Sequence, residues 1–68
     1  MKSLKEIIRE ANISYNDICS ALSIKSAGTV SLKINGKANF TTKEASNLKK
    51  LINEKTGKKY SLEDLFPG

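Results

Sequence analysis

Apolar residues recur every three or four positions through most of this 68-residue chain, which is the spacing of one face of an α-helix. Two clear runs are Leu4, Ile7, Ile8 and Ala11 near the start, and Ala45, Leu48, Leu51 and Ile52 further on. No stretch of the sequence alternates apolar and polar residues as a half-buried strand would. The pattern predicts an all-α domain with five helices at about 3–11, 14–22, 26–35, 41–54 and 61–66.

Four of the predicted helices begin with the same motif, a hydroxyl residue followed three positions later by an acid. The four pairs are Ser3 with Glu6, Ser14 with Asp17, Thr41 with Glu44, and Ser61 with Asp64. In this capping box the hydroxyl accepts a first-turn N–H, and the acid reaches back to the amide of the capping residue. Glutamate is the usual acid, so aspartate makes a weaker signal. Asn35-Gly36 predicts the end of the third helix, and Pro67 predicts the end of the last one.

The helix predicted at 26–35 departs from this motif at its start. Ser26 can cap it, but the residue three positions later is Thr29 instead of an acid. The first-turn amides and the positive end of the helix dipole therefore lack a compensating carboxylate. A helix N-terminus of this kind can bind phosphate, which a carboxylate would repel. The departure favours an anionic partner for this helix.

Residues 14–35 predict two short helices joined by a tight turn at 23–25. Two helices that cross at roughly 90–120° around such a turn form a helix-turn-helix, whose second helix can enter the major groove of DNA. Between Asp17 and Glu44 the sequence contains no acidic residue. The basic residues of this interval are Lys25, Lys33, Lys37 and Lys43. The predicted geometry and the charge together favour DNA binding.

The composition narrows the possible classes of function. A net charge of +5 favours an anionic partner, usually nucleic acid, although surface lysines also keep small domains soluble. The single cysteine permits no intramolecular disulfide, and the chain contains no histidine. The sequence shows no phosphate-binding loop, metal-ligand spacing or pair of catalytic groups. We therefore expect one cytoplasmic domain over 1–68 that is not an enzyme and that needs no cofactor, metal or membrane span.

The stretch 13–22, Ile-Ser-Tyr-Asn-Asp-Ile-Cys-Ser-Ala-Leu, resembles the first motif helix of the Cro/CI-type, lambda-repressor-like helix-turn-helix family of phage transcription regulators. The stretch 29–37, Thr-Val-Ser-Leu-Lys-Ile-Asn-Gly-Lys, resembles the recognition helix of that family and its exit. Segments 40–44 and 60–66 resemble the starts of the later helices. The resemblance implies a compact five-helix domain that binds operator DNA in a bacterial host cell. It also implies a possible homodimer on a palindromic site.

Three positions depart from the family pattern. Tyr15 stands where the family usually has a glutamine that contacts phosphate, although its hydroxyl can replace that contact. Ser23 replaces the usual glycine of the turn, and Cys19 replaces the usual alanine. Because Cys19 lies on the apolar face with Ile18 and Leu22, we expect it to behave as a small buried hydrophobe.

Two sets of residues are candidates for contacts with DNA, and a plain solvated helix surface is the alternative for both. The residues expected to reach base edges are Ala27, Gly28, Thr29, Ser31 and Leu32. The residues expected to reach phosphates are Tyr15, Asn16, Lys25, Ser26, Lys33, Asn35 and Lys37. The first set contains no Arg, Gln or Asn, so specificity is expected to be modest or to depend on DNA shape. Asn35 also has a competing role at the end of its helix.

These observations predict a sequence-specific transcription regulator that acts by occupying an operator in double-stranded DNA. The alternative is an antirepressor that binds the DNA-binding domain of a phage repressor protein, since exposed Ala27 and Leu32 would also suit a protein contact. A homodimer surface is expected near the C-terminus, although core packing would explain the same residues. These residues are Tyr60, Leu62, Leu65 and Phe66.

Overall fold

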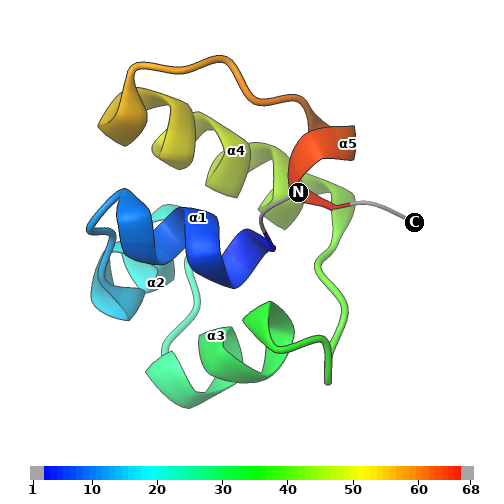
Figure 1. Ribbon diagram of the computed structural model, residues 1–68. Helices are drawn as coiled ribbons and strands as arrows, with labels where there is room; N and C mark the ends of the chain where they lie inside the picture. The colour runs from blue at the N-terminus through cyan, green and yellow to red at the C-terminus, as the bar shows by residue number, and fades with distance from the viewer. Residues whose placement is uncertain (1–2, 67–68) are drawn as a thin grey trace.

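The described residues, 3–66 of the computed structural model, form five helices that begin directly after the predicted capping residues (Figure 1). The helices are α1 (Leu4–Glu10), α2 (Tyr15–Leu22), α3 (Ala27–Ile34), α4 (Thr42–Thr56) and α5 (Leu62–Leu65). No strand occurs among these residues, so the predicted all-α class is confirmed. The predicted end of α4 at 54 is wrong, because the helix continues until Gly57 stops it in the left-handed conformation at φ 70°. Pro67 lies outside the described residues.

Hydroxyl side chains cap four of the helices, as the motif predicts. Each accepts the backbone N–H three positions on, at 3.3, 3.1, 3.1 and 3.2 Å for Ser3, Ser14, Thr41 and Ser61. The acid completes the box at Thr41, whose N–H donates to Glu44 Oε1 at 2.9 Å, and at Ser61, whose N–H donates to Asp64 Oδ2 at 3.0 Å. Aspartate therefore closes the last box as fully as glutamate closes the other. The same backbone hydrogen bond lowers the pKa of Asp64.

Apolar side chains from all five helices meet in one core. The buried members are Ile7, Ile8, Ile13, Ile18, Leu22, Val30, Ile34, Leu48, Ile52 and Leu65. α2 contacts both α4 and α3, and α5 packs on α4, so that the chain closes into a body of 27 × 24 × 20 Å. Over residues 3–66, no helix has the length and apolar character that crossing a membrane requires.

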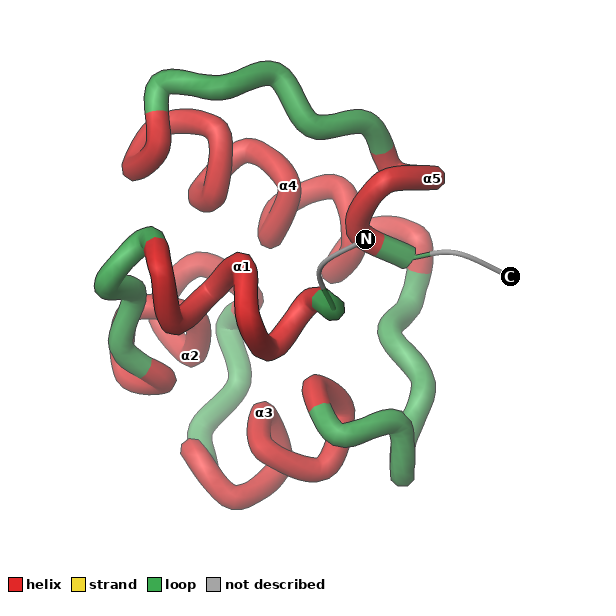
Figure 2. The backbone as a smooth tube through the Cα atoms, in the orientation of Figure 1, coloured by secondary structure: helices red, strands yellow, loops and turns green. Residues whose placement is uncertain are grey.

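The loops on the two sides of α3 each contain a left-handed residue, and these two residues set where α3 lies. Ser23 has φ 58°, and the N–H of Ile24 closes the turn on the carbonyl of Cys19 at 2.9 Å. This conformation costs a non-glycine residue about 1 kcal/mol, and the packing of Ile24 against the core offsets that cost. Beyond α3, Gly36 takes φ 82° without such a cost. Figure 2 shows α3 between these two loops, at an edge of the molecule.

Most of the predicted dimer surface belongs to the interior. Leu65 is 1% exposed, and the ring of Phe66 packs edge-on against Phe40 with centroids 5.1 Å apart. Tyr60 is half-buried and packs against the core. Core packing therefore accounts for these residues, and Leu62, at 39% exposed, is the member of the set that faces solvent.

Candidate nucleic-acid interface

α3 turns one face to the core and the other to solvent. Val30 and Ile34 form the inner face and are 0% and 8% exposed. The five residues predicted to reach bases divide into an exposed group and a half-buried group at the edges of the helix. The exposed residues are Gly28, Thr29 and Leu32, and the half-buried ones are Ala27 and Ser31. The helix therefore brings most of this set onto one accessible face.

The N-terminus of α3 differs from those of the other four helices. Ser26 has the extended backbone of a capping residue at φ −124°, but its hydroxyl accepts no backbone amide of the described chain. Its carbonyl accepts the N–H groups of Thr29 at 3.1 Å and Val30 at 3.3 Å, so the helix still begins there. The first turn carries no acidic residue. The positive end of this helix dipole is thus left available to an anion.

Exposed polar groups lie at both ends of α3, as predicted for contacts with phosphates. Lys25 and Ser26 immediately precede the helix, and both are exposed. Lys37 follows the left-handed Gly36 at the other end and is also exposed. We call these three residues, together with the exposed residues Gly28, Thr29 and Leu32 of α3, the α3 surface.

The start of α2 contributes less than the sequence predicts. Tyr15 is half-buried and packs against the core, so only part of its side chain faces solvent. Asn16 is exposed, but the next residue is the exposed Asp17, whose carboxylate would oppose a phosphate. This helix start therefore has a weaker attraction for anions than the start of α3.

Asn35 takes the structural role that competes with a phosphate contact. Its side-chain amide donates to the carbonyl of Ser31 at 2.8 Å and to the Ser31 hydroxyl at 3.2 Å. The backbone N–H of Asn35 also donates to the Ser31 carbonyl, at 3.0 Å, so both the backbone and the side chain of Asn35 bond to the last turn of α3. Asn35 therefore helps to end the helix, while its backbone leads into Gly36.

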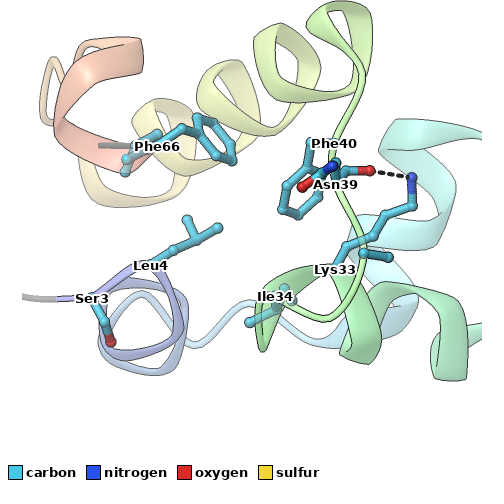
Figure 3. A pocket seen from close by; sticks show the side chains of 10 residues that line it. Ser3, Leu4, Lys33, Ile34, Asn39, Phe40 and Phe66 are labelled. Atoms are coloured by element: carbon cyan, nitrogen blue, oxygen red, sulfur yellow. Dashed lines mark hydrogen bonds between the residues drawn. The ribbon is translucent and has the colours of Figure 1, made fainter. Parts of the chain in front are cut away.

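Lys33 is held inside the domain. Its ammonium lies 2.7 Å from Glu44 Oε1 and 5.8 Å from the ring centroid of Phe40. It also donates to the carbonyl of Asn39 at 3.1 Å (Figure 3). The side chains of Lys33 and Glu44 are only 14% and 19% exposed. Lys33 was predicted to face phosphates, but its charge is neutralised locally and ties the end of α3 to the start of α4. Neither local spacing nor periodicity indicates this pair, whose members are 11 residues apart.

The ion pair makes the stability of the domain depend on pH. The hydrogen bond from Lys33, and next the one from the Thr41 amide, lower the pKa of Glu44 below its ordinary value. A carboxyl whose pKa is lower in the folded state stabilises the fold above its ordinary pKa. That stability is lost as the pH falls through the folded-state pKa.

We therefore expect Glu44→Gln to lower the free energy of unfolding by about 1 kcal/mol at neutral pH, and by progressively less in acid. Glutamine keeps the capping box, so the difference reports the charge. Urea unfolding from neutral to acid pH measures it, with Glu54→Gln, an exposed carboxylate of α4, as the control. Parallel curves for wild type and Glu44→Gln over the whole range would contradict the role of the ion pair.

A pocket lies beside this network, between the start of α1 and the end of α3 (Figure 3). Its walls are mainly apolar and include Leu4, Ile34, Phe40 and Phe66. Lys33 is the charged residue of its described lining, and its ammonium is already paired with Glu44. The pocket thus offers an apolar recess, and its described lining contains no pair of acid–base groups.

The predicted site residues that the structure brings together are those of the α3 surface. Across residues 3–66, no three His, Cys, Asp or Glu side chains gather as a metal site would require. Cys19 is half-buried, not fully buried as expected, and packs against the core as a free thiol. Comparison with models of protein families, with curated proteins and with solved structures found no match to this chain.

Proposed function

We propose that this protein is a sequence-specific DNA-binding regulator of the Cro/CI type, a lambda-repressor-like helix-turn-helix domain. α2 and α3 form the motif, and α3 enters the major groove of an operator, which the protein then blocks by occupancy. The observation that carries the proposal is the α3 surface itself: an exposed helix face without an acid, bordered by lysines, at a helix N-terminus without a carboxylate.

The dimensions of this surface suit DNA. The eight residues of α3 span about 12 Å, which is about the width of the major groove. Lys25 at one end and Lys37 at the other would then meet the two phosphate backbones that border the groove. Ser26 and the first-turn amides of α3 can donate hydrogen bonds to the nearer backbone. The net charge of +5 adds a long-range attraction.

A titration with fluorescent DNA tests the proposal. The purified protein is titrated by fluorescence anisotropy against duplexes from the DNA beside its own gene and against scrambled duplexes, at two salt concentrations. We expect saturable binding that favours one natural duplex by at least ~10³-fold. Equal, weak binding to all duplexes that disappears with added salt would overturn the proposal.

The flanking lysines should control the salt dependence of this binding. Lys25→Ala and Lys37→Ala are each expected to weaken binding to every duplex and to reduce the slope of log K against log salt by about 1. Lys59→Ala is the matched control, because Lys59 is exposed and belongs to the loop between α4 and α5. Figure 1 shows this loop on the opposite side of the molecule from α3. An unchanged slope for both variants would remove these lysines from the interface.

An antirepressor is the second candidate, and the exposure of Leu32 favours it. Leu32 is 49% exposed at the middle of the α3 surface, where it could fill an apolar pocket of a repressor's DNA-binding domain. Immobilised protein incubated with the purified repressor encoded nearby would then retain that repressor, and Leu32→Ala would abolish the retention. Retention of DNA instead of the repressor would decide for the first proposal.

A further inference from the structure

Leu32 occupies the centre of the outward face of α3. With about 100° between successive residues of a helix, Leu32 points directly away from the midpoint of Val30 and Ile34, which face the core. Gly28 lies one turn earlier on the same side, and it has no side chain to hold a partner away. If α3 enters a groove of DNA, the isobutyl group of Leu32 is therefore the part of the helix that reaches the base pairs first.

Two polar side chains near this face, those of Asn35 and Lys33, are already bonded within the domain. The side-chain amide of Asn35 donates to the carbonyl and to the hydroxyl of Ser31. Lys33 is bonded to Glu44 and to the carbonyl of Asn39. Thr29 remains beside Leu32 with a hydroxyl that can bond to a base, but a single hydroxyl distinguishes bases poorly. Sequence discrimination must then depend largely on an apolar contact.

We infer that Leu32 is the main specificity-determining residue, and that it recognises the 5-methyl group of a thymine. This inference rests on the proposed function. The thymine methyl is the apolar group that unmodified base pairs present in the major groove. At a G·C pair, the same leucine would cover hydrogen-bonding groups without replacing their water. The substrate class is therefore operator DNA with a thymine at the position that faces Leu32.

The surroundings of Leu32 favour DNA over a protein as its partner. Gly28 and Thr29 of α3 and Asn35 just after it are small or polar, so Leu32 is an isolated apolar side chain, whereas a stable protein interface buries many residues on each side. Lys25 and Lys37 border the same surface with positive charge. A polar, cationic surface with one apolar centre matches a groove lined by phosphates and containing a methyl group.

Deoxyuridine substitution tests the inference, because it removes the thymine methyl and preserves base pairing. Wild-type protein is first used to select duplexes from a random-sequence library. Each thymine of the selected duplex is then replaced singly by deoxyuridine, and affinities are measured by fluorescence anisotropy. At one thymine of the duplex we expect an approximately 4-fold loss for wild type, as for removing one buried methyl group. Leu32→Ala should bind the thymine and deoxyuridine duplexes equally.

The control and the outcomes separate the inference from the proposed function. Lys59→Ala, at an exposed residue outside the α3 surface, should retain the preference for thymine, and circular dichroism melting verifies that each variant is folded. A selected duplex that binds equally well after every deoxyuridine substitution would overturn the role of Leu32 and leave the proposed function standing. Failure to enrich any duplex would overturn both the inference and the proposed function. If the wild-type protein then retained the repressor and Leu32→Ala did not, this face would be assigned to a protein partner.

Discussion

Replacing Leu48 with alanine is expected to lower the free energy of unfolding by about 3 kcal/mol. Leu48 is 0% exposed in α4, and α4 is the helix on which both α2 and α5 pack. The substitution removes the transfer free energy of the lost carbons and leaves a cavity that neighbouring helices cannot fill. A domain of 68 residues has a total stability of only about 3–10 kcal/mol, so the variant should be partly unfolded near body temperature.

Urea unfolding followed by circular dichroism measures this loss, and two leucines of graded burial calibrate it. Leu51→Ala, on the same helix but half-buried, should cost less than Leu48→Ala, and Leu62→Ala should cost about 0.5 kcal/mol or less. This order follows directly from burial. If Leu48→Ala cost no more than Leu62→Ala, the packing of α4 against α2 would have to be different.

The helix starts and the core were predictable because both depend on residues that are close in sequence. A hydroxyl and an acid three positions apart identify a helix start whatever the rest of the chain does, and Thr41 with Glu44 forms the box that this spacing predicts. The buried Leu48 and Ile52 follow from helical periodicity alone. The end of α4 was less predictable, since polar residues near a C-terminus fit a helix or a loop equally well, and the actual stop is the backbone conformation of Gly57.

The candidate site was predictable in outline and not in its charge pattern. The sequence indicates that α3 is exposed and lacks an acid, but it does not indicate that Lys33 is paired with Glu44. That pair forms only when the loop after α3 folds back and brings the start of α4 beside the end of α3. The bond from Asn35 to Ser31 did have a signal, because residues four apart on a helix are neighbours. The consequence of this bond for the proposed DNA contact was not predictable, because it depends on which other polar side chains near α3 are already bonded within the domain.

Thr29→Glu is expected to weaken DNA binding by about 100-fold while making the domain more stable. The substitution would give Ser26 the acid that the other four helix starts carry, so that a carboxylate could accept the Ser26 N–H and compensate the helix dipole. We expect a gain of about 0.5–1 kcal/mol in the free energy of unfolding. The same carboxylate would lie at the helix end nearest the phosphates. A like-charge contact of this kind costs several kcal/mol, and each 1.4 kcal/mol is about tenfold in affinity.

The opposite signs of these two effects make Thr29→Glu a strong test of how α3 meets DNA. Thr29→Gln is the matched control, because glutamine can also accept the Ser26 N–H and carries no charge. It should stabilise the domain in part and weaken binding far less than glutamate does. If glutamate and glutamine weakened binding equally, the loss would belong to the threonine hydroxyl and not to repulsion of phosphate. If neither variant affected binding, the N-terminus of α3 would lie away from DNA. A 100-fold loss confined to Thr29→Glu, in a domain that this substitution makes more stable, would show that this helix start lacks an acid because it binds an anion.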